Sequence, residues 1–162
     1  MSDARIELLL RNLEQAFDLR SWHGTNLFGS LRGVTPGLAS WRPQPARHNI
    51  AELAVHAAYW KYRVCRTLSD RTPRSFTLRG SNFFPREGVR TPAEWGEDLA
   101  LLKRWHLELI GVVKSTDPNG LRTPAGSDRF TRTDLILGAA AHDLYHAGQI
   151  QLIKRLHAGA TH

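Results

Sequence analysis

The stretch AAHDLYHAGQIQLIKRL, residues 140–156, places two histidines four residues apart in an otherwise apolar helical pattern. Apolar residues recur here at steps of three and four, the spacing of a helix that buries one face. Thr131 and Asp134 fit a capping box at its start. We therefore expect a long helix that begins near Thr131 and ends with the quoted stretch. Its inward face should hold Leu135, Ala139, His142, His146, Gln149, Ile153 and Leu156.

The same spacing predicts three further amphipathic helices earlier in the chain. They cover residues 2–19, 49–68 and 91–113. Asn49 with Glu52, and Thr91 with Glu94, have the spacing of capping boxes at the starts of the second and third of these helices. No segment shows the alternation that is typical of a strand. The sequence thus predicts an all-α protein, a four-helix bundle in a single domain over residues 1–162.

The connection over residues 69–90 is longer than most connections in compact domains. Such a segment either crosses the fold from one end to the other or covers a functional site as a lid. Both alternatives are open at this point.

Composition and charge argue against several classes of protein. The net charge of +7 is basic, but the arginines are scattered among acids and loops, so nucleic-acid binding is not expected. A single cysteine, Cys65, allows no intramolecular disulfide. No apolar run is long enough to cross a bilayer, and the start lacks a secretion signal. We expect a cytoplasmic protein without membrane contact, and the sequence leaves a homodimer open.

The histidine pair predicts a metal site. His142 and His146 are one helical turn apart, so both imidazoles can reach one ion. A third ligand has to come from another helix, and His56 lies beside the inward stripe of the helix over residues 49–68. Each histidine alone is better explained as a hydrogen-bonded core residue. Three buried imidazoles together favour a shared divalent ion, because it satisfies ring nitrogens that would otherwise need separate partners.

The segment His142-Asp143-Leu144-Tyr145-His146 also resembles the metalloprotease pattern H-E-x-x-H. Asp143 is one methylene shorter than the usual glutamate base. No Asp or Glu follows it to supply a carboxylate ligand. A metalloprotease is therefore not expected.

Several neighbours of the predicted site have two interpretations. Gln149 either orients a ligand or packs between helices, with equal support. Trp60 and His106 can wall the site or join it, but core packing is favoured for both. His23 can approach the site from a connection. His48, His157 and His162 are expected to be peripheral, and Cys65 lies on the face of its helix opposite His56.

Arginines in the long connection offer a further possibility. Arg79, Arg86 and Arg90 can attract an anionic thiol cofactor, although simple surface exposure is favoured.

The segments HNIAELAVHAAYWKYRV (48–64), WHGTNLFGSLRG (22–33) and HDLYHAGQI (142–150), with Trp95 and Leu99 opening the third helix, resemble the DinB/YfiT-like superfamily. The resemblance spans nearly the whole chain, and its most specific part is H-x-x-x-H-x-G-Q. It implies a four-helix bundle with a long crossover connection. It also implies that His56, His142 and His146 bind a divalent ion of the nickel or zinc type.

The same resemblance implies a metal-dependent enzyme that activates a low-molecular-weight thiol, as an S-transferase does, or water, as a hydrolase does. Its partners would be a small-molecule thiol and an electrophilic substrate. Three neutral histidines leave at least one position on the ion free, which is typical of catalytic sites. The alternative is a non-catalytic metal-binding or stress-related interaction protein, which a closed site with His106 as fourth ligand would favour.

Overall fold

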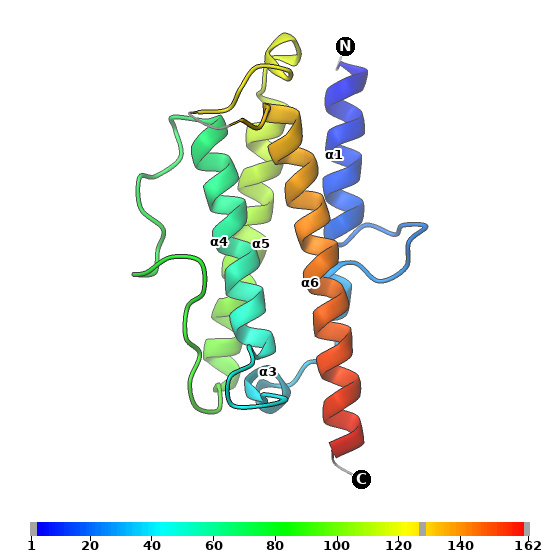
Figure 1. Ribbon diagram of the computed structural model, residues 1–162, viewed down its shortest axis with the longest axis vertical. Helices are drawn as coiled ribbons and strands as arrows, with labels where there is room; N and C mark the ends of the chain where they lie inside the picture. Colours follow the sequence, from blue (N-terminus) through cyan, green and yellow to red (C-terminus); the bar gives the residue numbers. More distant parts are fainter. Residues whose placement is uncertain (1–2, 127–128, 161–162) are drawn as a thin grey trace.

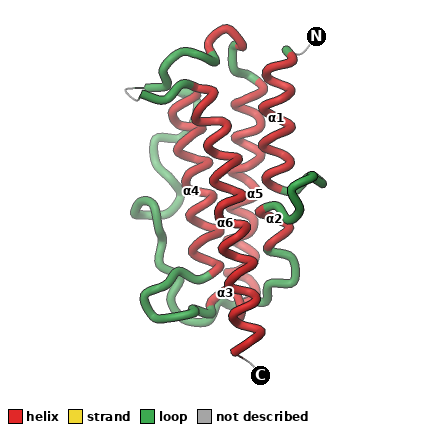
Figure 2. Tube along the Cα trace, turned by 45° about the vertical axis from the view of Figure 1, so that its right-hand side comes forward, coloured by secondary structure: helices red, strands yellow, loops and turns green. Residues whose placement is uncertain are grey.

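Four long helices run side by side in the computed structural model, which describes residues 3–126 and 129–160 (Figure 1). They are α1 (Ala4–Phe17), α4 (Ile50–Leu68), α5 (Pro92–Lys114) and α6 (Arg132–Ala160). Three short helices lie in the connections: α2 (Leu27–Ser30), α3 (Pro36–Ser40) and the 3-10 turn η1 (Pro118–Gly120). Figure 2 shows helices and loops throughout the described residues, which confirms the predicted all-α bundle. Ser2 and His162, which the sequence placed in a helix and at the periphery, lie outside the described residues.

Side-chain caps fix where the long helices begin. Asn49 and Glu52 form a reciprocal capping box at α4, and Thr91 and Glu94 form another at α5. The hydroxyl of Thr131 accepts from the Asp134 amide while the carboxylate accepts from the Thr131 amide, so α6 starts as predicted.

The order of the helices requires a crossover. α4 packs against both α5 and α6, and α1 packs against the other side of α5 and α6. α4 and α5 are neighbours that point in the same direction, so the chain has to return along the whole bundle between them (Figure 1). The connection over residues 69–91 makes this return, which confirms the crossover alternative. It also brings the middle of the connection beside α4.

One hydrophobic core joins the four long helices. Two residues expected on inward faces are not part of it. Trp60 is 40% exposed and Leu156 is 46% exposed, so the prediction that both face the core is wrong. Trp60 lies under the crossover connection, which hydrogen-bonds its indole instead of burying it. Leu156 lies in the last turns of α6, which extend past the ends of the neighbouring helices (Figures 1 and 2). None of the described helices combines the length and apolar character needed to cross a membrane.

Glu52 ties the loops at one end of the bundle to α4. Its buried carboxylate accepts hydrogen bonds from the Arg42 guanidinium, from Nδ1–H of His48 and from the backbone amide of Arg86. Burial by itself would raise the pKa of this carboxyl, but the hydrogen bonds outweigh it and lower the pKa from 4.5 to about 2.

This shift predicts how stability depends on pH. Because the folded-state pKa of Glu52 is depressed, its contribution is complete above about pH 5 and is lost as the pH falls from about 4.5 toward about 2. Glu52→Gln should lower the free energy of unfolding by at most about 3 kcal/mol at pH 7. The difference between the two proteins should shrink toward pH 3. Urea unfolding at several pH values measures it, and a constant difference from pH 7 to pH 3 would contradict the assignment.

Candidate metal centre

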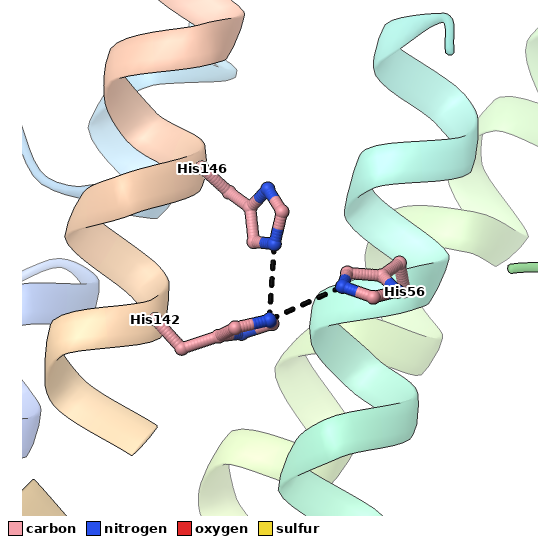
Figure 3. Close-up of side chains that lie close together, drawn as sticks. All are labelled: His56, His142 and His146. Atoms are coloured by element: carbon pink, nitrogen blue, oxygen red, sulfur yellow. Dashed lines mark hydrogen bonds between the residues drawn. The ribbon is translucent and has the colours of Figure 1, made fainter. Parts of the chain in front are cut away.

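Three histidines from two helices meet at one point inside the bundle (Figure 3). His56 comes from α4, and His142 and His146 come from consecutive turns of α6. Nε2 of His142 lies 3.1 Å from Nε2 of His56 and 3.0 Å from Nε2 of His146. The structure thus brings together the three histidines that the sequence selected, with the same ring atom of each pointing inward.

The opposite ring nitrogens of two of these histidines are held by hydrogen bonds. Nδ1–H of His56 donates to the backbone carbonyl of Asn82 over 2.8 Å, and Nδ1–H of His146 donates to Oε1 of Gln149 over 2.6 Å. A neutral imidazole with a proton on Nδ1 carries a lone pair on Nε2. Both rings are therefore fixed in the tautomer that presents a ligand atom to the centre.

Burial keeps these rings uncharged. It lowers the pKa of His142 to about 3 and the pKa of His146 to about 4, and it also lowers the pKa of His56. The closeness of His56 and His146 lowers the pKa of His142 further. At neutral pH the cluster therefore consists of three neutral imidazoles, the form in which histidine binds metals.

Protons alone do not satisfy this arrangement. Nε2 of His142 can carry one proton and donate it to either His56 or His146, but not to both. The Nε2 lone pair of the other histidine then faces the His142 nitrogen at about 3 Å with no proton between them, which is a repulsive contact. A cation between the three nitrogens removes this repulsion. Two ligands at about 2.0–2.1 Å from one ion are about 2.8–3.4 Å apart for angles of about 90–110°, so the separations of 3.1 and 3.0 Å from His142 to its two neighbours fit a shared ion.

Asn82 reaches the site from the crossover connection. Its φ of 65° is left-handed, a conformation that asparagine tolerates better than most residues. In this conformation its carbonyl accepts from His56 while its side-chain oxygen accepts from the indole N–H of Trp60 over 3.0 Å. The ring of Phe83 stacks on His56 at a centroid distance of 3.9 Å. No periodic pattern in the sequence marks either of these connection residues as part of a site.

A buried ion pair lies next to the cluster. Lys61 of α4 bonds to Asp143 of α6, and the two residues are 2% and 0% exposed. Asp143 follows His142 directly in sequence, so the pair fixes α4 against α6 where His56 and His142 meet. Asp143 is fully buried with Oδ2 bonded to Lys61, a position in keeping with the expectation that it is no metalloprotease base.

The remaining candidate histidines are not in the cluster. His106 is buried and stacked on Phe17 at a centroid distance of 3.7 Å, and burial lowers its pKa to about 3. It packs in the core, as favoured by its sequence context. His23 is exposed and lies near the Ser21 hydroxyl instead. His48 is not merely peripheral, because its ring stacks on the outer face of Phe83 at 3.7 Å.

The arginines of the crossover connection and Cys65 do not belong to the histidine cluster. Arg79 is exposed, as the sequence favoured, whereas Arg86 and Arg90 are partly buried and pair with the buried Asp98. Cys65 is fully buried, and burial raises the pKa of its thiol to about 12, so it remains protonated.

Gln149 provides a direct test of the ligand geometry. Gln149→Met keeps the length of the side chain and removes the acceptor for Nδ1–H of His146. We expect this variant to bind zinc about 10- to 100-fold more weakly than the original chain. Gln149→Glu, which retains an acceptor, should bind at least as tightly as the original chain. Competition with a chromophoric chelator measures both affinities, and equal binding by the methionine variant would show that Gln149 does not support the ligand.

A pocket opens onto the three histidines. It has a volume of about 590 Å³, and Gln149 and Phe83 line it together with the ligand side chains. An ion held by His56, His142 and His146 would therefore be reached from this pocket.

A family model described as the DinB superfamily matches residues 20–150. The matched region contains all three histidines, Asn82 and Gln149. No curated protein and no solved structure matches the chain.

Proposed function

The chain belongs to the DinB superfamily, and on that basis we propose that it is a metal-dependent enzyme that activates a low-molecular-weight thiol or water. His56, His142 and His146 would bind one divalent ion, nickel or zinc. The observation that carries this proposal is the convergence of three Nε2 atoms, with the rings of His56 and His146 held by Asn82 and Gln149.

The bound ion would supply positive charge that lowers the pKa of a thiol or water ligand toward about 7. The chain's own residues do the rest. Three neutral ligands leave the charge of the ion uncompensated, which favours an anionic nucleophile. Phe83 shields His56 from solvent by stacking on it. Gln149 and the Asn82 carbonyl keep both outer ligands in one orientation while the nucleophile enters from the pocket.

In the reaction that we propose, the thiol or water loses its proton to solvent, and its sulfur or oxygen attacks a small electrophile held in the same pocket. As the new bond forms, the bond between the attacked atom and its leaving group breaks, and the leaving group departs with that electron pair and takes a proton from solvent. A turnover assay tests this. The chain loaded with zinc or nickel should consume an electrophile in the presence of at least one member of a thiol panel, or hydrolyse it with water alone. The metal-free chain and a His142→Ala variant are the controls. Equal rates with and without metal across the panel would overturn the enzymatic function.

The alternative is that the ion only stabilises the bundle. It predicts a closed four-ligand site, with His106 as the fourth ligand. His106 instead stacks on Phe17, outside the group of three histidines. An open pocket on the ligand side favours catalysis over a purely structural ion.

A further inference from the structure

The walls of the pocket above the histidines are mainly apolar. They include Leu53, Phe83, Tyr145, Leu152, Ile153 and Leu156. Three of these, Tyr145, Leu152 and Leu156, are 65%, 56% and 46% exposed, although each is large and apolar or aromatic. They follow one another on α6 at helical spacing, so they form a continuous strip that begins beside His146. An exposed strip of this kind beside a site favours contact with an apolar ligand.

Among the described residues, the acidic or basic side chain that lines the pocket, apart from the histidines, is the basic residue Arg47. Arg47 is exposed, so a cationic side chain is available at the pocket. No aspartate or glutamate is among the residues that line this pocket in the described part of the chain. The carboxylate of Glu52 is nearby but is held by Arg42, His48 and the amide of Arg86. Arg47 therefore has no acidic partner within the pocket.

The apolar surface continues beyond Arg47. A second hollow of about 420 Å³ shares Pro43, Arg47 and Leu156 with the first and extends to Trp41 and Ala160. The two hollows form one groove that runs from the histidines along α6. Arg47 lies where they join, so a ligand in the groove can place one charged group there and apolar parts on either side.

We propose that the groove binds an amphipathic carboxylate as the organic substrate, with its anionic group on Arg47 and its apolar body against Leu152 and Leu156. The inference deepens the proposed function, since the reactive end of this substrate would lie at the three-histidine centre. A guanidinium binds a carboxylate through paired hydrogen bonds, which a neutral or cationic ligand cannot form. A divalent ion on three neutral imidazoles adds further positive potential at the far end of the pocket.

Binding of three probes with the same eight-carbon chain tests the proposal: octanoate, octan-1-ol and octylammonium. Calorimetry with the zinc-loaded chain should show octanoate binding at least about 10-fold more tightly than either of the others. Arg47→Gln should remove most of this preference, and Leu152→Asn should weaken octanoate and octan-1-ol together. Arg11→Gln, which changes an exposed arginine on α1, is the matched control and should bind like the original chain. The Arg47 substitution leaves the backbone carbonyl that accepts from Arg42 in place, so the loop should keep its structure.

The outcomes separate this inference from the metal centre. Normal zinc binding with equal affinity for octanoate and octan-1-ol would overturn the substrate class and leave the metal centre intact. Octanoate binding that needs zinc but is unchanged in Arg47→Gln would also overturn it, because the carboxylate would then lie on the ion. Preference for octanoate that depends on Arg47 in the metal-free chain would support the inference even if no ion binds.

Discussion

Replacing His142 by alanine should weaken the binding of a divalent ion by about 100- to 1000-fold. His142 is the central residue of the cluster, because its Nε2 lies within 3.1 Å of the same atom in both His56 and His146. Zinc sites with four ligands bind with about 10–16 kcal/mol, so one ligand contributes about 3–4 kcal/mol. Isothermal titration with zinc and with nickel measures the loss. His23→Ala is the matched control, since it removes an exposed histidine outside the cluster.

Thermal unfolding provides a second measurement on the same variants. An ion that binds only the folded chain raises its melting temperature with increasing ion concentration. The original chain and His23→Ala should show this rise, and His142→Ala should show little of it. Because the imidazole is replaced by a smaller side chain, circular dichroism should confirm that the variant remains helical. A His142→Ala variant that stays folded and binds zinc as tightly as the original chain would contradict the three-histidine site.

Replacing Lys61 by methionine should destabilise the fold by about 4 kcal/mol. Lys61 and Asp143 are both buried, and the substitution leaves the Asp143 carboxylate without its counter-charge in the core. Breaking a buried ion pair from one side costs about 3–5 kcal/mol, because the remaining group has to be buried as a charge or take up a proton. The burial that raises the pKa of Asp143 to about 6 in the presence of Lys61 reflects the same cost. Chemical unfolding at pH 7 measures the effect.

The double variant Lys61→Met, Asp143→Leu separates charge from packing. It removes both charges and replaces them with apolar groups of similar length, so it should recover most of the lost stability. A double variant as unstable as Lys61→Met alone would show that the lysine contributes through its packing and not through the pair. Lys61 also lies 5.1 Å from the centre of the Phe17 ring, a contact that the methionine side chain partly retains.

Periodicity predicted the features of this protein that lie within single helices. The capping residues Asn49, Thr91 and Thr131 located three helix starts, and the four-residue spacing placed His142 and His146 on one turn of α6. His56 lies between Leu53 and Trp60, beside the inward stripe of its helix, and this position indicates it as the third ligand. These features depend on local hydrogen bonds and on which face is apolar, which a sequence encodes directly.

The supporting contacts could not be predicted in this way. Asn82 reaches His56 only because the crossover connection returns along α4, and its left-handed conformation has no periodic signal. The pairing of Lys61 with Asp143 joins residues 82 positions apart, and each alone resembles a polar interruption of an apolar helix. The exposure of Trp60 likewise depends on the path of the connection. Such contacts follow from the packing of distant segments, which no local pattern specifies.

X-ray absorption on the zinc-loaded chain, prepared without an affinity tag, tests the metal centre most directly. We expect one ion per chain with three imidazole ligands. At least one further ligand should be an oxygen from solvent or a sulfur from an added thiol. His142→Ala prepared in parallel should lose the three-imidazole signature. A spectrum of the original chain with fewer than three imidazoles on the ion, or with four, would contradict this account.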